Sequence, residues 1–317
     1  MSIVAPSKAS TATVQLTPRR VCSTIDELLD GATDRQPFVT SDSKSGSRFE
    51  RVTLGGEAHI VKYIHVDDDF TMRCSGDVGP RPLLVWESGL MDIAPDIIEH
   101  GTVGVARGIG RHGWGAAILM RDLRDALVPP GDDAVPVEHH LRFIDHMAGL
   151  AARAWDWTDT IGLMPYQTRY DWFCDSMVDA ERELGFPAIV PRIAGQGWEQ
   201  FQRVAPNDVR TLVGSLRLDK SPLVEALGTT PSTFLHGDWK FGNVGAHADG
   251  RTVLIDWSYP GVGPICHELA WYLALNAARL PLSKEESIET LRSALVRHGV
   301  EVDGWWQKQL DLCLLGG

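Results

Sequence analysis

The sequence contains few cysteines, and they are widely scattered. Its 317 residues include five cysteines, and no two of them form a C-x-x-C pair. The pattern therefore predicts neither a disulfide framework nor a cysteine-based zinc site. We expect free thiols in a reducing compartment, which favours a cytoplasmic location.

Long apolar runs are also missing. No stretch approaches the roughly 18 uninterrupted apolar residues that a membrane-spanning helix needs, so we expect no membrane partner. The first 20 residues are rich in Ser, Thr and Ala but have no apolar core segment, so they do not predict a secretory signal. We interpret residues 1–35 as a leader followed by a short helix.

Basic residues are outnumbered by acidic ones. Lys and Arg total 30 and Asp and Glu total 42, which gives a formal net charge of −12. A nucleic-acid partner would favour a basic surface and is not expected. The acidity is compatible with a cationic acceptor such as an amine, but modest acidity mostly serves solubility and indicates little about the ligand. Both a monomer and a homodimer remain open.

Two carboxylates and one amide occur at fixed offsets in one block of the sequence. Asp238 ends an H-G-D segment, Asn243 follows it in the pattern D-x-x-x-x-N, and Asp256 lies in an I-D-W segment after an apolar run. Phosphoryl transfer from ATP needs a carboxylate that takes the proton of the acceptor hydroxyl, and oxygen ligands for Mg²⁺. The protein-kinase motifs H-R-D-x-x-x-x-N and D-F-G supply those groups at the same D-to-N offset.

The motifs H-G-D and I-D-W resemble those of the aminoglycoside phosphotransferase family, the small-molecule branch of the kinase-like fold. Gly263-Pro264 and the H-E-L-A segment at 267–270 follow as in that family, with Glu268 where the family usually has Asp. The strong part of the resemblance covers about residues 232–275, and a weaker part reaches back to about residue 36. The resemblance implies an α+β fold of the bilobal protein-kinase-like type. We expect an N-lobe with an antiparallel sheet and a helix in residues 36–123, and a larger, mainly helical C-lobe in residues 124–317.

The resemblance also implies roles for the residues of the block, with ATP and Mg²⁺ as cofactors. Asp238 is expected to be the catalytic base, and Asn243 and Asp256 the metal ligands. Lys240 either stabilises the transferred phosphate or faces solvent. His236 is expected to hold the loop rather than to act as a base. The carboxylate of Glu268 is expected to hydrogen-bond to the backbone of the catalytic loop.

The nucleotide half of the site is expected upstream. Strand patterns at 38–40, 48–54 and 59–66 surround a Ser- and Gly-rich turn at 43–47, in which Ser45, Gly46 and Ser47 are candidates for covering the phosphates. Lys62 lies in a β-branched strand, like the V-A-I-K lysine that pairs with the α- and β-phosphates.

A helix expected at 82–91 carries Glu87, our choice for the partner of Lys62. Glu99 is the competing candidate, and a surface position for Glu87 stays open. The segment after the strands at 102–106 and 114–120 resembles the connection between lobes, where the backbone of Met120, Arg121 and Leu123 would meet the adenine edge.

Helical patterns continue at 137–157, 166–184, 196–204, 208–217 and 266–278, and Ser283 and Glu286 form a capping-box pattern. In the family that the chain resembles, a segment like 160–230 lines the acceptor pocket. Its aromatic residues serve equally well as core, and its carboxylates, Asp171, Asp175 and Asp179, as a solvated face.

The patterns together predict an ATP- and Mg-dependent phosphotransferase that acts on the hydroxyl of a small molecule. The acceptor classes are an amino sugar, a sugar, an amino alcohol or an aminoglycoside-like compound. A nucleotide-binding pseudokinase with a regulatory or scaffolding role is the alternative. A protein kinase is less favoured, because the sequence lacks an A-P-E motif and only a short link joins Asp256 to Pro264.

Overall fold

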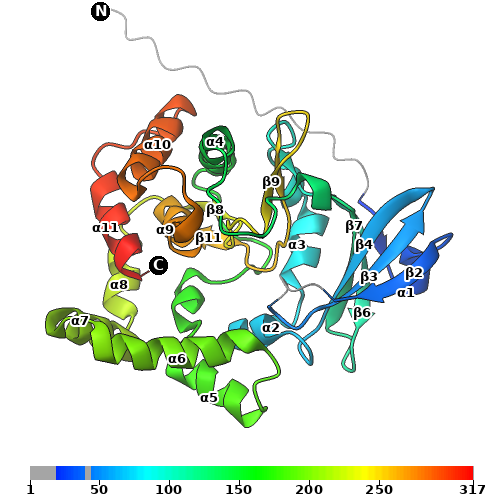
Figure 1. The fold of residues 1–317 in the computed structure, drawn as a ribbon, viewed down its shortest axis with the longest axis horizontal. Coiled ribbons are helices and arrows are strands. Elements are labelled where there is room, and N and C mark those ends of the chain that lie inside the picture. The colour runs from blue at the N-terminus through cyan, green and yellow to red at the C-terminus, as the bar shows by residue number, and fades with distance from the viewer. Residues whose placement is uncertain (1–18, 40–43, 317) are drawn as a thin grey trace, which may run out of the picture.

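A six-stranded sheet forms one side of the molecule (Figure 1). The computed structural model describes residues 19–39 and 44–316. In spatial order the strands of the sheet are β1 (Val21–Cys22), β6 (Thr102–Ile109), β7 (Gly115–Arg121), β4 (Glu57–Ile64), β3 (Arg48–Leu54) and β2 (Thr33–Phe38). All neighbours pair antiparallel except β1 and β6, which are parallel.

Lys62 lies in the middle of this sheet. Its strand, β4, is mostly buried, and Lys62 pairs in register with Phe49 of β3 and Ile118 of β7. A lysine at the centre of an apolar strand is costly unless a carboxylate meets it. At the outer edge, β2 is largely exposed and its register with β3 shifts between Thr33 and Gln36.

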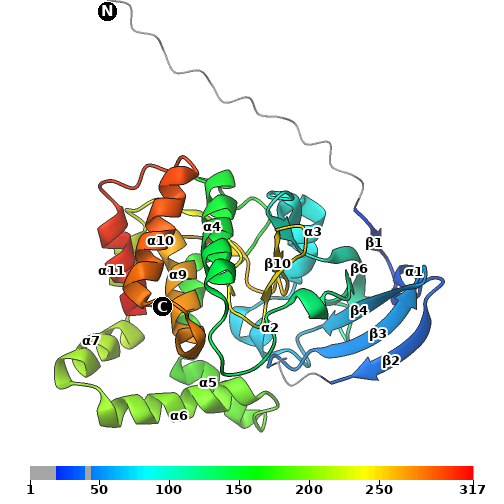
Figure 2. The same ribbon diagram turned by 45° about the horizontal axis from the view of Figure 1, so that its top comes forward.

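Short helices connect the sheet to the rest of the chain. They are α1 (Ile25–Leu28), α2 (Phe70–Ser75), α3 (Arg81–Ser88) and the 3-10 turns η1 (Leu90–Asp92) and η2 (Arg124–Ala126). Asp69 caps α2, because its side chain accepts hydrogen bonds from the N–H groups of Thr71 and Met72. In Figures 1 and 2, α2 and α3 lie between the sheet and the helical part of the molecule.

The larger part of the molecule is mainly helical. Two small sheets lie within it, one with the order β5 (Ile98–Glu99), β10 (Thr252–Leu254), β9 (Val244–Ala246), the other pairing β11 (Gly261–Gly263) with β8 (Thr233–Leu235). Its helices are α4 (Val137–Arg153), η3 (Tyr166–Asp171), α5 (Asp175–Glu183), α6 (Ile189–Val204), α7 (Asn207–Leu218), α8 (Ser221–Leu227), α9 (Ile265–Leu275), η4 (Ala277–Arg279), α10 (Lys284–Arg297) and α11 (Trp306–Gly316).

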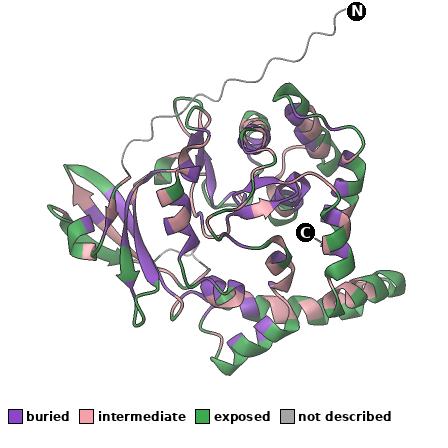
Figure 3. Ribbon diagram, turned by 180° about the vertical axis from the view of Figure 1, so that it is seen from behind, coloured by how far each residue is buried: buried purple, intermediate pink, exposed green. Residues whose placement is uncertain are grey.

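One hydrophobic core runs through both parts. It joins Ile64 and Ile118 of the large sheet to Phe143 of α4 and Leu269 of α9. By contrast, α7 buries no residue and α6 buries only Pro191, so these two helices form an arm at the periphery (Figure 3). Among the described residues, none of the helices is long and apolar enough to cross a membrane.

Most of the expected elements are present, with shifts of a few residues. The expected capping box of Ser283 and Glu286 is confirmed at the start of α10. The helix expected over 166–184 is interrupted, because Phe173 has φ of +60° and separates η3 from α5. A left-handed residue cannot continue a right-handed helix. The expected strand at 38–40 begins earlier, at Thr33, and residue 40 lies outside the described residues.

Candidate active site

The loop that carries Asp238 joins β8 to β9. It is anchored at its centre by Trp239, which is fully buried, and at its end by the carbonyl of Asn243, which accepts the N–H of Ile255 (2.9 Å). Gly237 has φ of +85°, and a Cβ there would lie 2.1 Å from the carbonyl oxygen of Tyr259. Only glycine fits a left-handed position so close to another backbone, which accounts for the middle letter of H-G-D.

Asp238 is held by three donors. Its Oδ2 accepts hydrogen bonds from Asn243 Nδ2 (2.7 Å) and from Lys240 Nζ, and its Oδ1 accepts one from the indole N–H of Trp271 (2.8 Å). The side chain is only 2% exposed. The structure thus brings Asp238 and Asn243 together, and it adds Lys240, for which the sequence left two positions open, and Trp271.

Glu268 supports the same loop from α9. Its two carboxylate oxygens accept the N–H groups of His236 (3.0 Å) and Gly237 (2.8 Å). Burial raises the pKa of Glu268 to about 7, although nearby Arg169 and these two N–H groups act in the opposite direction. The longer arm of glutamate thus reaches the loop backbone in the way expected of the family's aspartate.

His236 is a structural residue. Its Nε2 lies 3.1 Å from the carbonyl oxygen of Ile255, and its Nδ1 accepts the N–H of Asp238 (3.3 Å). Burial lowers its pKa to about 4, so the ring is neutral and the Nε2 proton can be donated to the carbonyl.

Asp256 meets Lys62 across the two parts of the molecule. Lys62 Nζ lies 2.6 Å from Asp256 Oδ1, which also accepts the hydroxyl of Ser258 (2.6 Å). Burial alone would raise the pKa of Asp256, but Lys62 and Lys240 outweigh it and hold that pKa well below its usual range. Asp256 has φ of +63°, an unusual backbone for an aspartate that aims its carboxylate at the sheet.

The partner expected for Lys62 is wrong. Glu87 of α3 forms an ion pair with Arg107 of β6 instead. The competing candidate, Glu99, pairs with Arg121 and accepts the N–H of Gly101 (2.9 Å). Helix α3 forms within a few residues of the bounds expected for it. Glu87, however, lies on the face of α3 that meets the exposed Arg107 of β6.

Asp69 is the further carboxylate near Lys62. Burial alone would lower the pKa of Lys62, but Asp256, Asp69 and Asp238 outweigh burial and raise that pKa. Asp69 also accepts the hydroxyl of Ser47 (2.9 Å), which connects the turn at 45–47 to the start of α2. Sequence reasoning missed Asp69, although an Asp directly before an apolar helix is a capping signal.

The turn expected to cover phosphates is partly described. Ser45 Oγ and Ser47 Oγ lie 2.8 Å apart, and the carbonyl of Ser45 accepts the N–H of Phe70 (3.1 Å). Gly46 has φ of +95°, and a Cβ there would lie 2.3 Å from the carbonyl oxygen of Asp68. The start of the expected turn, up to Ser43, lies outside the described residues.

The expected adenine contacts follow the end of β7. Met120 and Arg121 are the last residues of that strand, and Leu123 precedes η2. The N–H of Arg121 donates to the carbonyl of Gly101 (2.9 Å), so this group is already used within the protein. The assignment of Met120, Arg121 and Leu123 to the adenine edge stays a prediction.

Two oxygens at the site suit a magnesium ion. Asn243 donates through Nδ2, and Asp256 accepts through Oδ1, while no hydrogen bond among the described residues engages Asn243 Oδ1 or Asp256 Oδ2. Within residues 19–39 and 44–316 no group of three or more His, Cys, Asp or Glu side chains could hold a metal alone. Mg²⁺ is usually bound by one or two carboxylates together with substrate phosphates, so these two oxygens of Asn243 and Asp256 are candidate ligands.

Trp271, which contacts Asp238, stacks on a second aromatic ring. Phe173 and Trp271 have ring centroids 6.3 Å apart and are nearly parallel, at 4°. The carbonyl of Phe173 accepts the indole N–H of Trp198 on α6. A continuous series of contacts therefore links the peripheral arm to Asp238.

Three carboxylates of the segment 160–230 are paired within that segment. Each of the three named in the sequence forms an ion pair with a basic side chain: Asp171 with Lys220, Asp175 with Arg217 and Asp179 with Arg182. None of them is left unneutralised to meet an ammonium group.

Solved structures with a similar fold are kinases. The amicoumacin kinase hAmiN, solved in complex with AMP-PNP, Ca²⁺ and Ami, is 13% identical, with a TM-score of 0.51 over 89% of this chain and 77% of that chain. A microcompartment-associated aminopropanol kinase is 10% identical, with a TM-score of 0.50 over 89% and 84%. The aminoglycoside phosphotransferase APH(3'')-Id from Streptomyces rimosus is 16% identical, with a TM-score of 0.48 over 89% and 90%.

The fold is therefore that of the protein-kinase-like small-molecule kinases, as expected. Residues 179–302 match the model of the phosphotransferase enzyme family, APH. A search among curated proteins finds no match. The resemblance to the aminoglycoside phosphotransferase family is confirmed over this segment of the chain.

Proposed function

We propose that the chain transfers the γ-phosphate of ATP, with Mg²⁺, to a hydroxyl group of a small molecule. The observation that carries this proposal is the meeting of Lys62 with Asp256, 194 residues apart, beside the triad of Asp238, Lys240 and Asn243. Phosphoryl transfer depends mainly on positioning and charge neutralisation, which these side chains supply.

We assign each of these side chains a role in the transfer. Asp238 takes the proton of the acceptor hydroxyl as the oxygen of that hydroxyl forms a bond to the γ-phosphorus. The bond from that phosphorus to the β,γ-bridging oxygen breaks, and ADP leaves. Lys62 neutralises charge on the nucleotide phosphates, and Lys240 lies where it can neutralise the transferred group. Asn243 Oδ1 and Asp256 Oδ2 would hold Mg²⁺, which supplies further charge neutralisation when bound.

The ligand that the solved amicoumacin kinase holds, AMP-PNP, supports a nucleotide at the equivalent place in this chain. The short connection between Asp256 and Pro264 supports a small acceptor. The side chain of Asp256 is 30% exposed, so the nucleotide side of the site is open.

The test is Asp238→Asn, assayed for ATP-dependent ADP formation with Mg²⁺ over alcohols, sugars, amino alcohols and aminoglycosides. Loss of a general base typically costs about 10²–10⁴-fold in rate. We expect a loss of that size with nucleotide affinity, measured by calorimetry, nearly unchanged. The control is Asp208→Asn, at an exposed position of α7, which should keep full activity.

Full activity of Asp238→Asn would overturn the assignment of the base. Binding of Mg·ATP with no turnover for any acceptor would instead favour the pseudokinase alternative.

A further inference from the structure

A cavity of about 230 Å³ opens beside the catalytic loop. It lies between that loop, the end of α9, η4 and the segment before α4. Lys240 belongs both to this cavity and to the catalytic site, because its Nζ is bonded to Asp238. Lys240 therefore lies between the cavity and the carboxylate of Asp238. Its lining residues are Asp132, Lys240, Phe241, Gly242, Leu275, Asn276, Ala278 and Arg279.

Asn276 offers the cavity an unused donor. The residue is 4% exposed, and its Oδ1 accepts the N–H of Phe241 (3.0 Å), which fixes the orientation of the amide. Its Nδ2 has no hydrogen-bond partner among the described residues. A buried donor without a partner costs about 1–3 kcal/mol. An acceptor atom of a ligand would remove this cost.

Arg279 offers the cavity an uncompensated charge. Its Nε donates to the carbonyl of Asp133 (2.9 Å), and its guanidinium lies 5.5 Å from the centre of the Phe241 ring. In the part of the chain that the structure describes, no carboxylate lies within ion-pair distance of it. The remaining N–H groups of a guanidinium match a carboxylate or phosphate in a two-point contact. Asp132 is the single acidic residue of the lining.

A cationic acceptor would find fewer free carboxylates near the site. The carboxylates of the segment 160–230 that were candidates for binding an amine are paired with Lys220, Arg217 and Arg182. Donors thus dominate the cavity next to Asp238, while Asp171, Asp175 and Asp179 are already neutralised by basic partners.

We propose that this cavity binds an anionic group of the acceptor, a carboxylate or a phosphate, through Arg279 and Asn276. The acceptor hydroxyl would then face Asp238. The reaction of that hydroxyl rests on the proposed function, whereas the anion site does not. The cavity is smaller than the roughly 300–1,000 Å³ of drug-sized sites, so the acceptor is a compact hydroxy acid or alcohol phosphate.

The experiment compares four probes with the same three-carbon skeleton: glycerol, D-glycerate, glycerol 3-phosphate and 3-amino-1,2-propanediol. Each is titrated by calorimetry into the nucleotide-free full chain at constant ionic strength, and each is then assayed for Mg·ATP-dependent ADP formation. We expect one anionic probe to bind at least about tenfold more tightly than glycerol and the amine. Which of the two does so distinguishes a carboxylate from a phosphate.

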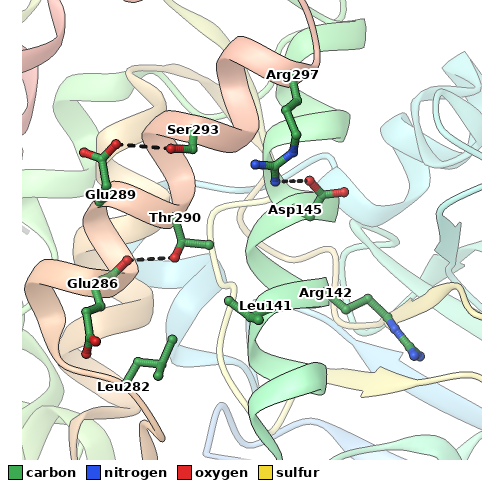
Figure 4. Close-up of a pocket in the computed structure, with 9 residues that line it drawn as sticks. All are labelled: Leu141, Arg142, Asp145, Leu282, Glu286, Glu289, Thr290, Ser293 and Arg297. Atoms are coloured by element: carbon green, nitrogen blue, oxygen red, sulfur yellow. Dashed lines mark hydrogen bonds and ion pairs between the residues drawn. The ribbon is translucent and has the colours of Figure 1, made fainter.

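Three variants assign the effect to the cavity. Arg279→Gln should weaken binding of the preferred anion about tenfold or more, whereas Arg279→Lys should retain most of it, because the charge remains. The matched control is Arg142→Gln. Arg142 lines the larger cavity, about 690 Å³, between α4 and α10, which includes no residue of the catalytic loop (Figure 4). Thermal unfolding of each variant checks that it is folded.

The outcomes separate the two proposals. Anion binding that depends on Arg279, without ADP formation for any acceptor, would support the anion site and refute the proposed reaction. ADP formation with equal affinity for the four probes, or tightest binding of the amine, would overturn the anion site alone. Equal losses in Arg279→Gln and Arg142→Gln would also overturn it.

Discussion

Trp271 is the side chain through which α9 contacts Asp238. Its indole N–H donates to Asp238 Oδ1 at 2.8 Å, and the second lone pair of that oxygen would be left for the acceptor hydroxyl of the proposed reaction. A hydrogen bond to a charged group contributes about 1.5–3 kcal/mol. We expect Trp271→Phe, which keeps a ring beside Phe173, to lower kcat about tenfold or more while nucleotide affinity stays unchanged. Steady-state kinetics tests this, and an unchanged kcat would contradict it.

Glu268 gives the stability of the loop a pH dependence. Its pKa rises from 4.5 to about 7 in the folded chain because of burial. Between these values the folded state binds a proton that the unfolded state has lost, so the free energy of unfolding falls as pH rises from about 4.5 to 7. In Glu268→Gln this contribution, up to about 3 kcal/mol, is absent.

Urea unfolding at several pH values measures this effect as the difference between the parent chain and Glu268→Gln. The stability of the parent relative to the variant should decrease between pH 4.5 and 7 and then level off. Glu225→Gln, at an exposed position, should show no such trend. A constant difference for Glu268→Gln would refute the raised pKa.

The residues that were predictable from sequence are those whose spacing is fixed by the loop itself. Asp238 and Asn243 lie in one loop, so their offset encodes their contact. The prediction that Glu87 pairs with Lys62 was wrong because an ion pair between two elements depends on which face of α3 meets the sheet. The residues around Glu87 in the sequence do not determine that face. The contact of Trp271 with Asp238 was not predicted because an aromatic residue in an apolar helix usually belongs to the hydrophobic core.

At the scale of the elements, His140 joins three helices. From α4, its ring nitrogens lie 2.9 Å from the hydroxyl of Tyr272 on α9 and 3.0 Å from the hydroxyl of Ser287 on α10. We expect His140→Ala to lower the free energy of unfolding by about 2–4 kcal/mol at pH 7, through a cavity and two lost hydrogen bonds.

Lowering the pH should reduce the difference in free energy of unfolding between the parent chain and His140→Ala. Burial lowers the pKa of His140 from 6.5 to about 4, so below pH 6.5 the unfolded state binds a proton that the folded state does not. The parent chain therefore loses stability between pH 6.5 and 4, and the variant lacks this loss. Chemical unfolding should show the gap narrowing by up to about 3 kcal/mol. His139→Ala, at a half-exposed position on the same helix, is the control.

Elements with regular patterns were predicted well, and irregular ones were not. The strands around Lys62 and the long α4 follow from alternation and helical periodicity. The break at Phe173 does not, because its left-handed backbone is held by tertiary contacts, namely the N–H of Trp198 and the ring of Trp271. The same contacts connect α6 to Asp238 through Trp271, so this part of the structure was the least predictable.

At the scale of the whole molecule, local stability should be uneven. Helices α6 and α7 bury almost nothing, whereas α4 and α9 lie in the central core. Segments with few buried contacts open with little free energy. We expect amide hydrogens in 192–218 to exchange on the order of 100-fold faster than those in α4 and α9. Hydrogen exchange with mass spectrometry measures this, and equal protection would contradict it.

The outer strand β2 bears on how copies of the chain could associate. Its register shifts against β3, Pro37 has no N–H to offer, and Asp34 and Arg35 are charged and exposed. These features disfavour the addition of a foreign strand to a sheet edge. The six-stranded sheet is thereby protected at this edge from growing into an intermolecular sheet. Copies of the chain would not associate by strand addition at β2, and crowding of many copies in the cell would not convert this edge into a site of aggregation.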